Sequence, residues 1–129
     1  AWAPLGTGMD DTVFALTTLP NGDLIAGGGF STAGGVTALR IARWNGSSWS
    51  AMGTGMGTLL SGPVLALTTL PNGDLIAGGS FTTAGGVAAT SIARWDGSAW
   101  SALGMGMNNS VRSLTALPSG DLIAGGEFL

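Results

Sequence analysis

The chain has 129 residues, of which 45% are hydrophobic, 24 are glycine and only 9% are charged, against about 25% charged residues in typical soluble domains. The net charge is −3, all four cations are arginine, and the sequence contains no His, Cys, Lys or Tyr. This composition excludes Ser–His and Cys–His pairs, Schiff-base lysines, disulfides and His or Cys metal sites, and four scattered arginines make no nucleic-acid footprint. We therefore expect no enzyme activity, no catalytic residue, no bound metal and no cofactor.

The first predicted unit consists of short strands separated by tight turns. Pro20 ends an apolar, β-branched segment, and the Asn21–Asp23 sequence Asn-Gly-Asp is a turn signal because Asn and Gly accept a positive φ. Ser31–Ala38, which contains Thr-Ala-Gly-Gly-Val, is expected to be a loop. In chain order, the four strands expected in this unit are Val13–Leu19, Asp23–Phe30, Leu39–Trp44 and Ser48–Met52.

The chain consists of internal repeats. LPNGDLIAGG begins at Leu19 and Leu70, and a near copy begins at Leu117, so the spacings are 51 and 47 residues. The strands expected in the second unit are Val64–Leu70, Asp74–Phe81, Ser91–Trp95 and Ala99–Leu103. Val111–Phe128 supplies a first and a second strand of a third unit, and Trp2–Gly8 matches a fourth strand that precedes the first unit. No segment has helical periodicity, because Gly or Pro occurs every few residues.

Four short strands in about 40–50 residues are typical of one blade of a β-propeller. The chain resembles the kelch-like β-propeller family in three recurring features: a glycine doublet that ends the second strand, an aromatic residue on the third strand and a Trp that opens the fourth. It is also similar to the GD-L-IAGG-F repeats of large bacterial secreted proteins. The doublets are Gly27-Gly28, Gly78-Gly79 and Gly125-Gly126.

The fold class expected is therefore all-β, with four-stranded antiparallel blades of about 47 residues in an incomplete propeller of about 2.5–3 blades. We divide the single propeller segment, residues 1–129, into a closing strand (1–9), a blade (10–56), a second blade (57–107) and a half blade (108–129). Because propellers close with about four to eight blades, the missing blades would come either from a second copy, giving a ring or filament, or from a longer parent chain. The residues expected at a closure between copies are Trp2, Leu5, Leu122, Ile123 and Phe128.

Four repeated tryptophans are candidate ligand-stacking residues: Trp44, Trp49, Trp95 and Trp100. Aromatic rings can stack on sugars, but the preferred interpretation is packing between blades, where large aromatic side chains dominate the energetics.

The turn aspartates and strand arginines are a second candidate set. Carboxylates suit calcium, but turn chemistry, with bonds to nearby backbone N–H groups, is the preferred role of the aspartates, and the arginines are expected to pair with carboxylates such as these. The members of this set are Asp23, Asp74, Asp121, Arg43 and Arg94.

Three functional hypotheses remain open. The first is a non-catalytic structural or assembly module, in an extracellular or cell-surface setting. The second is a lectin-like propeller that binds glycans at repeated weak sites and gains from avidity. The third is a duplicated or consensus-designed repeat protein without a ligand. A nucleic-acid partner is not expected, because the four arginines are scattered. A membrane span is not expected either, because no apolar run approaches the ~20 residues of a transmembrane helix.

Overall fold

The computed structural model of the chain describes residues 8–56, 62–103 and 109–126, and every regular element in these ranges is a β-strand. Blade 1 is a four-stranded antiparallel sheet in which the strands follow one another in chain order from one edge to the other. Its strands are β1 (Val13–Thr18), β2 (Leu24–Gly28), β5 (Ile41–Trp44) and β6 (Trp49–Ala51).

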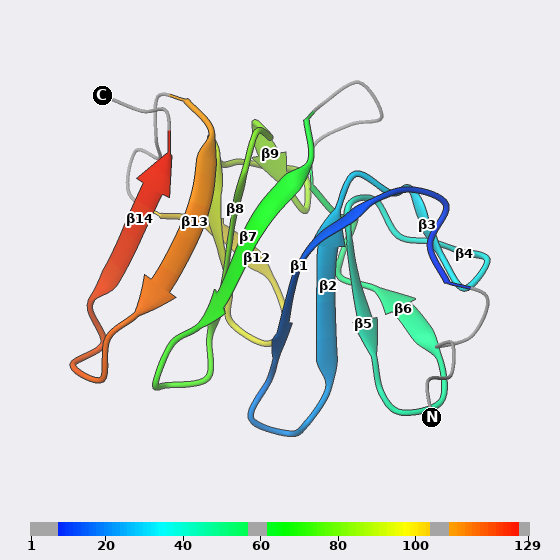
Figure 1. The fold of residues 1–129 in the computed structure, drawn as a ribbon, viewed down its shortest axis with the longest axis horizontal. Coiled ribbons are helices and arrows are strands. Elements are labelled where there is room, and N and C mark those ends of the chain that lie inside the picture. The colour runs from blue at the N-terminus through cyan, green and yellow to red at the C-terminus, as the bar shows by residue number, and fades with distance from the viewer. Residues whose placement is uncertain (1–7, 57–61, 104–108, 127–129) are drawn as a thin grey trace.

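Blade 2 repeats this arrangement, and a hairpin follows it. Blade 2 contains β7 (Val64–Thr69), β8 (Leu75–Gly79), β11 (Ile92–Trp95) and β12 (Trp100–Ala102), and the hairpin, here called the half blade, contains β13 (Val111–Ala116) and β14 (Leu122–Gly126). The sheets stand side by side, with the β1–β2, β7–β8 and β13–β14 turns at the same end of the molecule (Figure 1). β7 packs against both β1 and β13, so the first strands of the three units form one row.

The expected loop Ser31–Ala38 contains a small hairpin instead, and the equivalent segment of the second unit contains another. β3 (Thr32–Ala33) pairs with β4 (Val36–Thr37), and β9 (Thr83–Ala84) pairs with β10 (Val87–Ala88). Both glycines between the paired strands have positive φ, +57° and +80° in the first hairpin, which closes the two-residue turn. The Gly-Gly pair between Thr-Ala and Val was therefore a turn signal flanked by strand-forming residues, and the expectation of a loop was wrong.

The core lies mainly between the sheets, because each thin sheet buries apolar side chains on both faces. Between blade 1 and blade 2, Ile25 and Ile41 of blade 1 are fully buried against Val64, Leu75 and Ala77 of blade 2. The next junction repeats this contact with Ile76 and Ile92 of blade 2 and Val111, Leu114 and Leu122 of the half blade.

The two glycines of each doublet serve different contacts. A Cβ on Gly27 would lie 2.5 Å from Cγ1 of Val64 in the next blade, so Gly27 makes room for that side chain. A Cβ on Gly28 would overlap the carbonyl oxygen of Thr12 in its own blade, beside the bulge in the β1–β2 pairing. A close approach of another backbone is therefore found only at the second glycine.

Candidate functional site

The turn before the second strand of each blade is tied to the third strand by an ion pair. In blade 1, the Nε of Arg43 donates to Oδ2 of Asp23 at 2.7 Å. In blade 2, Arg94 makes the same contact with Asp74, with 2.6 Å between Nε and Oδ2. Each pair is partly shielded from water, since the aspartate side chains are 17% and 16% exposed.

The backbone of these turns is held by the asparagine rather than by the aspartate. The N–H of Asp23 donates to Oδ1 of Asn21 at 2.9 Å, and the N–H of Asp74 donates to Oδ1 of Asn72 at 3.0 Å. The aspartate carboxylates accept from the arginines and, at 3.3 and 3.4 Å, from the side-chain amides of the same asparagines. In the half blade, the N–H of Asp121 is 3.4 Å from Oγ of Ser119, and no ion pair of Asp121 occurs in the part of the chain that the structure describes.

The tryptophans form one cross-strand pair in each blade. Trp44 faces Trp49 and Trp95 faces Trp100, with ring centroids 5.3 Å apart in both pairs. Trp49, Trp95 and Trp100 are buried, and Trp44 is half-buried. The indole Nε1 of Trp100 donates to the carbonyl oxygen of Met52 at 3.0 Å, which connects blade 2 to the end of blade 1.

Trp95 carries the one buried side-chain polar atom without a hydrogen-bond partner in the described residues. Its indole N–H is buried and donates to nothing there. An unsatisfied buried donor costs about 1–3 kcal/mol, so such a group needs an explanation.

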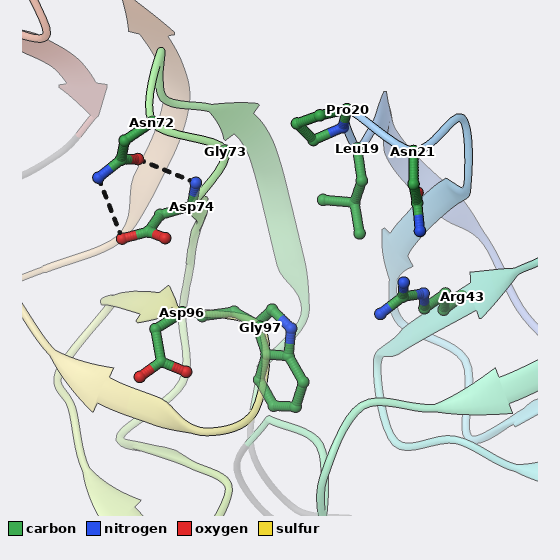
Figure 2. Close-up of a pocket in the computed structure, with 10 residues that line it drawn as sticks. Leu19, Pro20, Asn21, Arg43, Asn72, Gly73, Asp74, Asp96 and Gly97 are labelled. Atoms are coloured by element: carbon green, nitrogen blue, oxygen red, sulfur yellow. Dashed lines mark hydrogen bonds between the residues drawn. The ribbon is translucent and has the colours of Figure 1, made fainter.

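Trp95 also lines a pocket of about 280 Å³ between blade 1 and blade 2 (Figure 2). Blade 1 contributes Arg43 and the start of its β1–β2 turn, and blade 2 contributes its β7–β8 turn and the turn that follows β11. The lining residues are Leu19, Pro20, Asn21, Arg43, Asn72, Gly73, Asp74, Trp95, Asp96 and Gly97.

Asp96 is ionised at neutral pH and already engaged. The backbone N–H groups of Ser98 and Ala99 and the hydroxyl of Ser98 all donate to its Oδ1, and these bonds lower the pKa of the carboxyl. Asn45 has the same role in blade 1, where it accepts the N–H groups of Ser47 and Ser48.

A second pocket, about 340 Å³ and almost wholly apolar, lies on the outer face of blade 1. Val13 and Leu16 in its wall are 38% and 60% exposed, whereas Val64, the counterpart of Val13 in blade 2, is fully buried. We call this surface the open face of blade 1. Its pocket is lined by Gly8, Met9, Val13, Leu16, Leu24, Ala26 and Trp49.

The two described residues that were expected at a closure between copies lie on opposite faces of the half blade. Ile123 is 51% exposed on the outer side of the half blade, together with the exposed Leu117. Leu122 points the other way and packs against the core between blade 2 and the half blade. Trp2, Leu5 and Phe128 lie outside the described residues.

The described residues bring no three acidic side chains close enough to hold a metal ion. They also include no helix with the length and hydropathy that a membrane span requires.

A family model described as "Domain of unknown function (DUF5122) beta-propeller" matches residues 19–47 and 70–95. Each matched segment starts at the β1–β2 or β7–β8 turn and includes the small hairpin and the third strand of one blade. No curated protein matches the chain, and no solved structure does. The chain is built of β-propeller repeats, and the predicted all-β fold of four-stranded antiparallel blades is confirmed, with described sheets that do not close into a ring.

The pocket between the blades and the partnerless N–H of Trp95 are the features that the sequence did not indicate. The repeat alignment matches Trp95 with Trp44 and matches the Asn-Gly-Asp turn of one unit with that of the next. It does not show that Trp95 lies beside a turn of the preceding unit. Only the packing of one blade on the next brings the turn of blade 1 close to the third strand of blade 2.

Proposed function

We propose that this chain is a non-catalytic assembly module, a partial β-propeller whose open faces are completed by blades of another copy. The observation that carries the proposal is the exposure of the open face of blade 1. Val13 and Leu16 are 38% and 60% exposed, although their counterparts Val64 and Leu67 pack into the junction between blade 1 and blade 2. Exposed apolar patches of this kind mark interaction sites in soluble proteins.

The exposed surface of the half blade has the residues that fill such a pocket elsewhere in the chain. At the junction between blades 1 and 2, Leu19 and Ile25 pack against Val64, Leu67 and Leu75. At the next junction, Leu70 and Ile76 occupy the positions equivalent to Leu19 and Ile25. The equivalent residues of the half blade are Leu117 and Ile123, and both are exposed. They therefore match the open face of blade 1 in the way that successive blades match one another.

Contact between these two different surfaces is heterologous, so it gives a closed ring if the rotation fits and a filament if it does not. Further blades of a longer parent chain would satisfy the same surfaces. We also propose that the repeat is of the kelch-like type, on the strength of the glycine doublets and the recurring Trp44–Trp49 and Trp95–Trp100 pairs.

The oligomeric state of the purified 129-residue chain tests the assembly proposal. We expect native mass spectrometry and sedimentation velocity to show a defined oligomer or a filament rather than a monomer. Leu16→Asp and Ile123→Asp each place a charge in the proposed contact, and each should dissociate the assembly. Because both positions are exposed, neither change should unfold the individual subunit.

Val36→Asp and Val87→Asp are the matched controls. Both valines are exposed, at 44% and 46%, but they lie on the small hairpins rather than on the blade faces. They should leave the assembly intact. A monodisperse wild-type monomer, or equal disruption by the control variants, would refute the proposal.

A further inference from the structure

The pocket between blade 1 and blade 2 combines apolar and polar walls. Leu19 and Pro20 give it an apolar side, and Gly73 lies close by, since a Cβ there would be 3.3 Å from Cγ of Pro20. Arg43 and Asn21 of blade 1 and Asn72 and Asp74 of blade 2 supply the polar groups on opposite sides (Figure 2). Its volume of about 280 Å³ is just below the ~300–1,000 Å³ of pockets for drug-sized ligands, which suits a single-ring ligand.

The charges in and around the pocket disfavour an anionic ligand. Arg43 is paired with Asp23, and Arg94 is paired with Asp74. Asp96 adds a carboxylate whose Oδ1 is engaged by its own turn. An anion would therefore meet an excess of negative charge, and no described arginine at the pocket lacks a carboxylate partner.

The partnerless indole N–H of Trp95 requires a hydrogen-bond acceptor. Trp95 is only 9% exposed and forms part of the pocket wall, and its Nε1 lacks a partner among the described residues. A simple ammonium ion carries N–H donors only, so it offers no acceptor to this N–H. A neutral molecule with hydroxyl or ether oxygens satisfies the N–H and also donates to the carboxylate and carboxamide oxygens opposite.

We propose that this pocket binds one ring of a neutral polyhydroxylated ligand, a monosaccharide unit, with a sugar oxygen accepting the indole N–H of Trp95. The C–H face of such a ring matches the Leu19 and Pro20 side of the pocket, and its hydroxyls match the polar side. This binding uses the N–H of Trp95 rather than stacking on the tryptophan rings. It is independent of the proposed assembly, because the pocket lies within one chain.

Two-dimensional ¹H–¹⁵N NMR of the five indole N–H groups tests the proposal directly. Glucose, galactose, mannose and N-acetylglucosamine are titrated separately into the wild-type chain, in the millimolar range. We expect at least one sugar to shift the Trp95 indole resonance saturably and to leave the Trp44 indole resonance unchanged. Assignment in the wild-type chain makes this readout independent of any variant.

Trp95→Phe and Trp44→Phe form a matched pair of variants. Each removes an indole from a cross-strand pair with the same 5.3 Å centroid distance, but only Trp95 lines the pocket. Trp95→Phe should weaken sugar binding by roughly two- to tenfold, the effect of one neutral hydrogen bond. Trp44→Phe should bind as the wild type does.

The proposal is overturned if no sugar shifts the Trp95 resonance, or if both variants weaken binding equally. It is also overturned if N-acetylglycine methylamide, a neutral peptide-like probe, shifts this resonance while the four sugars do not. That result would assign the pocket to a peptide.

Discussion

Asp10 shows how one exposed side chain fixes the entry into a blade. Its Oδ1 accepts the backbone N–H groups of Ser31 and Thr32 at 2.8 and 3.0 Å, and its Oδ2 accepts the hydroxyl of Ser31 at 2.7 Å. These contacts join the segment before β1 to the start of the small hairpin. The bonds from the Thr32 N–H, the Ser31 hydroxyl and the Ser31 N–H lower the pKa of Asp10 from 3.8 to about 2.

The lowered pKa predicts how this contact responds to acid. A carboxyl whose pKa is lower in the folded state stabilises the fold above its unfolded pKa and loses that contribution as the pH falls through the folded value. We therefore expect the contribution of Asp10 to be complete above about pH 4 and to disappear as the pH falls towards about 2. Urea denaturation midpoints measured across this range should show a shallower pH dependence in Asp10→Asn than in the wild type.

Ser31→Ala is the companion variant, because it removes one of the three donors and leaves the carboxylate in place. It should reduce the pH dependence only in part. Identical pH profiles for Asp10→Asn and the wild type would contradict this account of the contact.

At the scale of the elements, the first glycine of each doublet sets how closely two sheets approach. A Cβ on Gly27 would lie 2.5 Å from Cγ1 of Val64 and 3.2 Å from Cδ1 of Leu67, and one on Gly78 would lie 2.6 Å from Cγ1 of Val111. Val64 and Val111 are fully buried, so they have little room to move away.

Gly27→Ala should therefore destabilise the chain by about 1–3 kcal/mol, the usual cost of overpacking a core. Gly29→Ala, two residues further along, is the control. A Cβ on Gly29 would have no neighbour closer than 4.0 Å, and the equivalent residue of blade 2 is Ser80. Thermal and urea denaturation of both variants measure the difference, and equal stabilities would show that the sheets can separate without cost.

The sequence predicts an element well when residues close to one another in the chain determine that element. The strands of each blade follow from β-branched runs, Asn-Gly turns and the repeat itself, and they lie within one or two residues of the expected ranges, as β7 (Val64–Thr69) shows. The small hairpins were missed because strands of two residues carry almost no periodic signal. The pocket beside Trp95 was not predictable, since it is formed by residues of two blades whose relative position depends on side-chain packing.

For the whole molecule, the sequence predicted blades but not which apolar residues would remain exposed. Periodicity alone puts Leu122 and Ile123 in the same strand, and only the packing shows that Leu122 faces blade 2 and that Ile123 faces outwards.

Successive units contact only their neighbours, so stability in such a chain is close to a sum of unit and junction terms. Blade 2, which has a junction on each face, should be the most stable part.

Hydrogen exchange measures this gradient directly. All five residues of β8 (Leu75–Gly79) are buried, and the strand pairs with β7 on one side and β11 on the other. β14 (Leu122–Gly126) pairs with β13 alone among the described strands, and none of its five residues is buried. We expect the slowest amides of β8 to exchange at least tenfold more slowly than those of β14, a difference of about 1.4 kcal/mol or more in opening free energy.

If Leu117 and Ile123 dock on the open face of another copy, protection in β14 should rise with protein concentration, and Ile123→Asp should abolish that rise. Uniform protection across β8 and β14 in the dissociated Ile123→Asp chain would contradict the nearest-neighbour account of stability.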